Sequence, residues 1–202
     1  MQSLDAKMRK RIKEQGRGWC FTPNAFLDLS SNDAVWVALS RLVQKGFARR
    51  LARGLYDYPR LHPKLGLLAP DPDTVAKALA SRDAIRLQPS AAYAANLLGL
   101  SEQVPARVIF LTDGPARSVK LGSREIILKN TTPRNMATAG RISGTVIQAL
   151  RFIGQKQIND AHIGQLRALL SAGDKVLLRK DRIYAPGWMH TIIDAIAGDA
   201  HA

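Results

Sequence analysis

Hydrophobic residues recur at helical spacing near the start of the chain. Leu4, Met8 and Ile12 lie four residues apart with charged residues between them, which predicts a first amphipathic helix. A second, short helix is expected to start at Thr22-Pro23, because proline at the first helical position loses only an N–H group that has no partner there. This helix should end near Asp28.

A third helix follows after a short turn. Val35, Leu39 and Leu42 fall on one face of it, which we expect to point inward. Either Ser30 or Ser31 can cap its N-terminus, and Lys45-Gly46 is a typical helix end. Two closely spaced helices of this kind suggest a helix-turn-helix.

The next segment has the pattern of a basic two-stranded ribbon. The strands are expected over Phe47–Ala52 and Leu55–Tyr58, with a tight turn at Arg53-Gly54. Helices followed by such a ribbon have the order of a winged helix-turn-helix. The sequence therefore predicts a DNA-binding domain over residues 1–60.

Prolines then interrupt the pattern, and a second unit begins. Residues 61–72 are expected to be a Pro-rich linker, and residues 73–202 a mixed α+β domain with a helical C-terminal tail, so the fold class is α+β. The elements expected in this second unit are a helix from Asp73, a strand over residues 84–87, an Ala-rich helix from Ser90 to Gly99, a strand over 107–112, an antiparallel pair over 119–121 and 125–129, and helices over 146–153, 160–171, 174–178 and 189–197.

Charge adds weight to the DNA-binding interpretation. The net charge is +14, from 30 Lys and Arg against 16 Asp and Glu. Residues 1–60 hold 12 basic and 5 acidic residues, so half of the excess lies in less than a third of the chain. A positive field of this kind favours the binding of polyanions without specifying a nucleotide sequence.

The cysteine content and the hydropathy indicate where the protein is located. A single cysteine, Cys20, excludes an internal disulfide, and the chain has no apolar run long enough for a membrane span. We therefore expect a cytoplasmic protein without a membrane partner.

The candidate DNA-binding residues come from the third helix and the ribbon. Arg41 is the best candidate to read guanine, Gln44 to read adenine, and Ser40 either base. The competing interpretation is that Arg41 pairs with Asp33 or Asp57, or contacts only phosphate. Trp36 is expected to pack against other elements rather than face DNA. The complete candidate set is Asn32, Ser40, Arg41, Gln44, Lys45, Arg49, Arg50 and Arg53.

The second unit carries polar residues beside apolar segments, at Asn96, Ser101, Gln103 and Asp113. Hydrogen bonds to the local backbone explain them adequately, and a partner surface is the alternative. The sequence has no catalytic constellation, phosphate-binding loop or metal-ligand spacing, so we expect no enzyme activity and no cofactor. A nucleic-acid-processing enzyme that uses Asp113 and Glu125 is the alternative from the enzyme class.

Three blocks of sequence carry a resemblance to a known family. GRGWCFTPNAFLDL, ALSRLVQKGFARRLARGLYDYP and PSAAYAANLLGLSEQVPARVIFLTDGPAR resemble the AbiEi family of antitoxins from type IV toxin–antitoxin systems, over roughly residues 15–153. The resemblance implies a winged helix that represses its own operon at inverted repeats in double-stranded DNA. It also implies a C-terminal region that opposes a nucleotidyltransferase-like toxin in phage defence, by direct contact or without it.

The leading hypothesis from the sequence is thus a DNA-binding antitoxin and autorepressor. The alternative is a winged-helix transcriptional regulator whose second domain senses a ligand or a partner protein.

Overall fold

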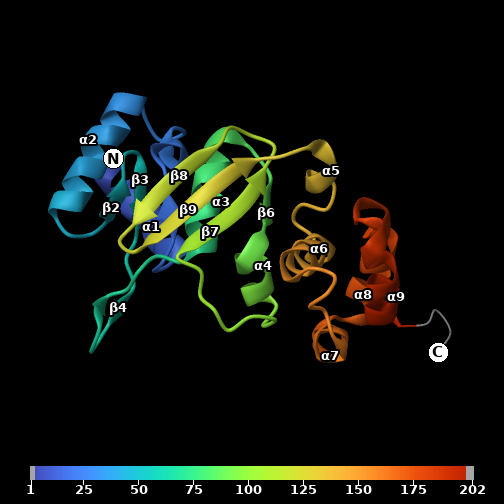
Figure 1. Ribbon diagram of the computed structural model, residues 1–202. Helices are drawn as coiled ribbons and strands as arrows, with labels where there is room; N and C mark the ends of the chain where they lie inside the picture. Colours follow the sequence, from blue (N-terminus) through green and yellow to red (C-terminus); the bar gives the residue numbers. More distant parts are fainter. Residues whose placement is uncertain (1–2, 199–202) are drawn as a thin grey trace. The chain divides into compact units, whose positions relative to one another are not determined.

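The computed structural model describes residues 3–198 as a mixed α+β structure, which confirms the expected fold class (Figure 1). These residues form two compact units. The first comprises the residues up to Ile85 together with Val119–Gly122, and the second comprises Arg86–Ser118 and the residues from Ser123 onward. None of the helices in this described part of the chain is long and apolar enough to cross a lipid bilayer.

The first unit begins with the helices that the sequence predicts. Ser3 caps α1, Leu4–Gln15, through a hydrogen bond that its hydroxyl accepts from the N–H of Ala6. The short second helix is a 3₁₀ turn, η1, Pro23–Phe26, and it is followed by α2, Asn32–Gln44. Ser31, rather than Ser30, caps α2.

A small sheet follows α2, and its central strand is the last one in sequence. The order is β1–β3–β2, and both pairs are antiparallel. The β2–β3 hairpin turns at Arg53-Gly54, where Gly54 has a φ of 73°, a left-handed conformation that favours glycine. The strands are β1, Cys20–Phe21; β2, Arg49–Ala52; and β3, Leu55–Asp57.

One apolar core holds these elements together. The inward face of α2 is fully buried, as the helical spacing predicts, and it packs with α1, η1 and the small sheet. Aromatic rings fill the space between them. The centre of the Phe21 ring lies 5.5 Å from that of Phe26 and 6.0 Å from that of Tyr56. The buried members are Met8, Ile12, Phe21, Phe26, Val35, Ala38, Leu39, Leu42, Ala48 and Tyr56.

The segment expected to be a linker contains secondary structure. β4, Leu61–His62, pairs with β5, Gly66–Leu67, in a short antiparallel hairpin. α3, Pro72–Asp83, then starts at Asp71, whose carboxylate accepts a hydrogen bond from the N–H of Thr74. Because α3 packs against β1, it belongs to the first compact unit and not to the second, where the sequence analysis placed it.

A four-stranded sheet has the order β6–β7–β9–β8. β6, β7 and β9 belong to the second unit, whereas residues 119–121 of β8 belong to the first. β7 runs antiparallel to β6 and parallel to β9, while β8 and β9 form a hairpin around Gly122-Ser123. The strand expected over residues 84–87 starts only at Leu87, because α3 continues to Asp83 and ends at Ala84 in a left-handed conformation. The strands are β6, Leu87–Pro89; β7, Arg107–Thr112; β8, Arg117–Leu121; and β9, Arg124–Asn130.

Helices complete the second unit and form the predicted C-terminal tail. α6 is its central buried helix, and a buried carboxylate, Asp181, joins it to α8 by accepting hydrogen bonds from Arg141 and Ser143. The helical elements are α4, Ala91–Leu97; α5, Pro133–Met136; α6, Ile142–Ile153; α7, Asp160–Leu169; α8, Ala172–Asp181; η2, Arg182–Tyr184; η3, Gly187–Met189; and α9, His190–Ala197.

Candidate nucleic-acid interface

The outward face of α2 is a row of polar and partly apolar side chains. Because the opposite face is buried in the core, the positions between Asn32 and Gln44 that do not point inward are exposed to solvent. Three of the candidate DNA-binding residues, Asn32, Ser40 and Gln44, lie on this exposed surface.

Arg41 lies at the edge of this face and has a partner that the sequence analysis did not consider. Its Nη1 atom is 3.5 Å from a carboxylate oxygen of Asp5 in α1, and not of Asp33 or Asp57. The Arg41 side chain is still 52% exposed, and an ion pair of this length at a surface contributes little free energy. The guanidinium therefore remains able to contact a ligand.

Arg49 points away from solvent into a structural ion pair. Its Nε and Nη2 atoms donate to the two carboxylate oxygens of Asp57, at 3.0 and 2.6 Å, and Nη2 also donates to the carbonyl of Leu68 at 3.0 Å. The Asp57 side chain is only 1% exposed. The carboxylate raises the pKa of the Arg49 guanidinium, so the charge is fixed. Arg49 thus joins β2, β3 and the base of the β4–β5 hairpin.

Arg50 and Arg53 are placed differently, because successive residues of a strand point to opposite faces. Arg50 is exposed and lies opposite Tyr56 in the ladder, while Arg53 is exposed at the turn of the hairpin. Lys45, at the end of α2, is also exposed. These three cations are available to phosphate groups.

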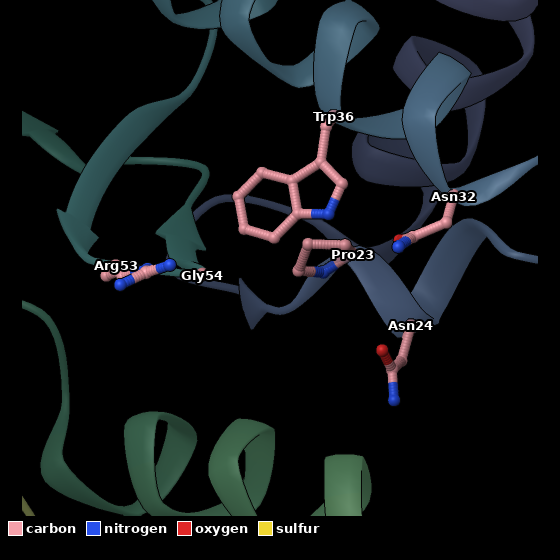
Figure 2. Close-up of a pocket in the computed structure, with 6 residues that line it drawn as sticks. All are labelled: Pro23, Asn24, Asn32, Trp36, Arg53 and Gly54. Atoms are coloured by element: carbon pink, nitrogen blue, oxygen red, sulfur yellow. The ribbon is translucent and has the colours of Figure 1, made fainter.

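A hollow of about 490 Å³ separates α2 from the hairpin turn (Figure 2). The indole of Trp36 points from α2 toward Pro23 and Gly54, with the side chain of Arg53 beside it at the turn. A Cβ atom on Gly54 would lie 3.5 Å from the indole, so glycine lets this turn approach the ring closely. The hollow is lined by Pro23, Asn24, Asn32, Trp36, Arg53 and Gly54.

Two members of this surface were missed by the sequence analysis. Trp36 makes an edge contact with Tyr56 at 6.4 Å, as expected of a packing residue, but 36% of it is exposed and it forms a wall of the hollow. Val37, 53% exposed, lies on the outward face of α2. Val37 lies four residues before Arg41, so the helical spacing places both on the same face of α2. This spacing could have identified Val37 from the sequence as a candidate for contact with the methyl group of thymine.

The arginines of the first helical segment have mainly structural partners. Arg11 donates to both carboxylate oxygens of Asp28 at 2.7 Å, which lowers the pKa of Asp28. The guanidinium of Arg9 lies 5.2 Å from the ring centre of Phe47, and that of Arg17 lies 4.8 Å from Tyr58. The lysines of α1 are exposed, and they leave this helix a basic outer side: Lys7, Lys10 and Lys13.

The polar residues proposed for a partner surface in the second unit make local bonds. Asn96 donates to the carbonyl of Ser101, and the Ser101 hydroxyl accepts from the N–H of Gln103. Asp113 accepts from the side chain and the backbone N–H of Arg86, and the side-chain bond is the main cause of its lowered pKa. A carboxylate oxygen of Glu125 lies 3.4 Å from Nε of Arg107. The two carboxylates of the enzyme alternative therefore belong to separate ion pairs.

Cys20, in β1 of the first unit, is only 3% exposed. Its Sγ atom lies 3.3 Å from the Thr74 hydroxyl. Burial raises the pKa of the Cys20 thiol to about 11, from an ordinary value of 9.0, although the contact with Thr74 opposes the shift. In the described part of the chain, no three His, Cys, Asp or Glu residues gather as a metal site would require.

A reactivity measurement tests the environment of Cys20. A shift from 9.0 to about 11 leaves roughly a hundredfold less thiolate at pH 8, so we expect alkylation by iodoacetamide to be slower than in urea by at least this factor. The pKa of the Cys20 thiol is higher in the folded protein than in the unfolded chain. Its contribution to the free energy of unfolding is therefore fully present below pH 9 and is lost as the pH rises toward 11. Equal alkylation rates in buffer and in urea would contradict the burial of Cys20.

Comparison with known proteins identifies a family. The model of a family of unknown function, DUF6088, matches residues 7–178, and the chain belongs to this family. The match spans parts of both compact units. A search of curated proteins found no match.

Proposed function

We propose that this DUF6088 protein binds double-stranded DNA through its first unit, which acts as a winged helix-turn-helix. In this proposal α2 is the recognition helix and the β2–β3 hairpin is the wing. The order of α1, β1, η1, α2 and the hairpin supports it, since this is the order of elements in winged-helix domains. The proposal rests most directly on the hollow beside Trp36, where the outward face of α2 and the wing turn lie next to each other.

The exposed residues divide into two roles. Ser40, Arg41 and Gln44 project from the recognition helix, where side chains reach base edges in the major groove. Lys45, Arg50 and Arg53 lie at the helix end and on the wing, where they contact phosphates. Arg49 has no role at DNA in this proposal, because Asp57 holds its guanidinium.

The hollow explains how one DNA strand could be positioned. Asn32 and Arg53 supply hydrogen-bond donors to phosphate oxygens on its rim, while the indole of Trp36 offers an apolar wall to a deoxyribose. Most hydrogen bonds in protein–DNA complexes go to the sugar–phosphate backbone and fix the register of the recognition helix. The hollow would thus place Ser40, Arg41 and Gln44 over a defined set of bases.

We further propose that the protein is a cytoplasmic antitoxin of a type IV system that represses its own operon. The resemblance to AbiEi antitoxins, over roughly residues 15–153, supports this assignment. The second unit, with its own buried helical core, would oppose a nucleotidyltransferase-like toxin. A gene for such a toxin beside this one supports the antitoxin, whereas its absence favours a regulator with a sensing domain.

Base and phosphate contacts can be separated by mutation. We expect Arg41→Ala to cost about 1–3 kcal/mol on the operator and to relax specificity at one position, because a base contact is lost. Arg53→Ala should weaken binding to all sequences and lower the slope of log K against log salt by roughly one. Fluorescence anisotropy with operator and random duplexes across salt concentrations measures both effects. Identical behaviour of the two variants would remove the proposed division of roles.

A further inference from the structure

The β4–β5 hairpin exposes an apolar surface that the proposed function does not use. Leu61 is 65% exposed, Leu65 at the turn 73%, and Leu67 55%. Leu61 and Leu67 are directly paired across the two strands, so their side chains share one face. Leucines exposed to this degree on a two-stranded ribbon indicate a binding surface.

The turn of this hairpin is built by specific hydrogen bonds. Nδ1 of His62 accepts from the N–H groups of Lys64 and Leu65, both at 3.2 Å. Gly66 follows with a φ of 69°, a conformation that favours glycine. The chain closes again where the N–H of Leu68 donates to the carbonyl of Arg60 at 3.0 Å. The tip that presents Leu65 is therefore a defined loop.

The base of the hairpin is fastened to the wing. Arg49 donates to the carbonyl of Leu68 while its other bonds hold Asp57, so one guanidinium fixes the wing strands and the hairpin base. Nε of Arg60 also donates to the carbonyl of Arg17. In Figure 1 the hairpin, marked by β4, projects from the strands of its own unit. It starts at the end of the wing opposite the Arg53 turn.

Charge identifies the partner. The segment from residue 58 to residue 70 contains Arg60, His62 and Lys64 but no carboxylate. A surface of leucines flanked by cations fits DNA, in which apolar side chains wedge between base steps in the minor groove while cations contact the phosphates. We propose that the β4–β5 hairpin is a second DNA-binding element, which inserts Leu65 into the minor groove of the bound duplex. This inference rests on the proposed function.

The test uses the full chain and the duplex it binds best. Leu65→Ser should weaken binding about tenfold, because the burial of one leucine is lost, and it should reduce the DNA bend measured by fluorescence resonance energy transfer between the duplex ends. Lys64→Ala should lower the salt slope by about one. Ile183→Ser is the matched control, since Ile183 is 66% exposed in the second unit. Thermal unfolding establishes that the variants fold.

Each outcome separates the two proposals. If Leu65→Ser binds and bends DNA as the wild type does while Arg50→Ala with Arg53→Ala weakens binding about a hundredfold, the hairpin inference is wrong and the proposed function stands. If the wild type does not bind DNA, both fail. If analytical ultracentrifugation without DNA shows a dimer that Leu65→Ser converts to a monomer, the leucines join two copies of the chain and the inference is overturned.

Discussion

Replacement of Arg49 by alanine is expected to lower the free energy of unfolding of the first unit by about 3–5 kcal/mol. The loss is large because the substitution leaves Asp57 without its partner. The Asp57 carboxylate is 1% exposed, and it would stay buried and charged without the two hydrogen bonds that the Arg49 guanidinium now donates to it. Arg50→Ala removes the same charge from the next residue of the strand and is the matched control, with an expected effect within about 0.5 kcal/mol.

Urea unfolding followed by tryptophan fluorescence measures this difference. Trp19 and Trp36 report on the first unit, and a Trp188→Phe background removes the tryptophan of the second unit from the signal. The midpoint should fall in Arg49→Ala with little change in slope. Equal midpoints for Arg49→Ala and Arg50→Ala would show that the ion pair does not hold the wing strands.

Loss of both exposed wing cations should separate two activities. In the double variant Arg50→Ala and Arg53→Ala, we expect affinity for the operator to fall about a hundredfold near 0.1 M salt, since each phosphate contact contributes a factor of roughly ten there. The salt slope should fall by about two. Removal of Lys156 and Lys180, two exposed cations of the second unit, is the matched control and should leave binding nearly unchanged.

If the antitoxin proposal is correct, the same double variant, expressed from an unrelated promoter, should still protect cells against the toxin that it opposes. This follows if the second unit opposes the toxin, because the wing is not part of its core. Colony survival, measured beside a promoter fusion, gives both readouts. A folded and abundant wing variant that fails to rescue would show that neutralisation depends on DNA binding.

The elements that the sequence predicts well are those specified by neighbouring residues. The inward face of α2 follows from its helical spacing, and its ends follow from a serine cap and Lys45-Gly46. The β2–β3 hairpin follows from Arg53-Gly54. In each case the physical cause lies within one or two turns of chain, so one sequence suffices.

What the sequence did not predict depends on contacts between distant residues. The β4–β5 hairpin has only two paired residues in each strand, too few for an alternating pattern, and its base is fixed by Arg49. The parallel pairing of β7 with β9 likewise cannot be predicted from the residue pattern of either strand alone. The assignment of α3 to the first unit depends on its packing against β1.

The candidate site shows the same division. Exposure of Ser40 and Gln44 follows from the helical pattern, whereas the partners of individual arginines do not. Arg49 and Arg50 are adjacent in sequence, yet one lies against Asp57 and the other faces solvent. The indole of Trp36 is part of a hollow only because the wing turn approaches it in the folded unit.

The most direct test of the account is a titration of the full chain against duplex DNA from upstream of its own gene, followed by fluorescence anisotropy at several salt concentrations. We predict tighter binding to this duplex than to a random one, with log K falling linearly as log salt rises, and a slope reduced by about two in the variant without Arg50 and Arg53. Absence of binding at low salt, or binding that this variant retains in full, would contradict the proposal that α2 and the wing form a DNA-binding surface.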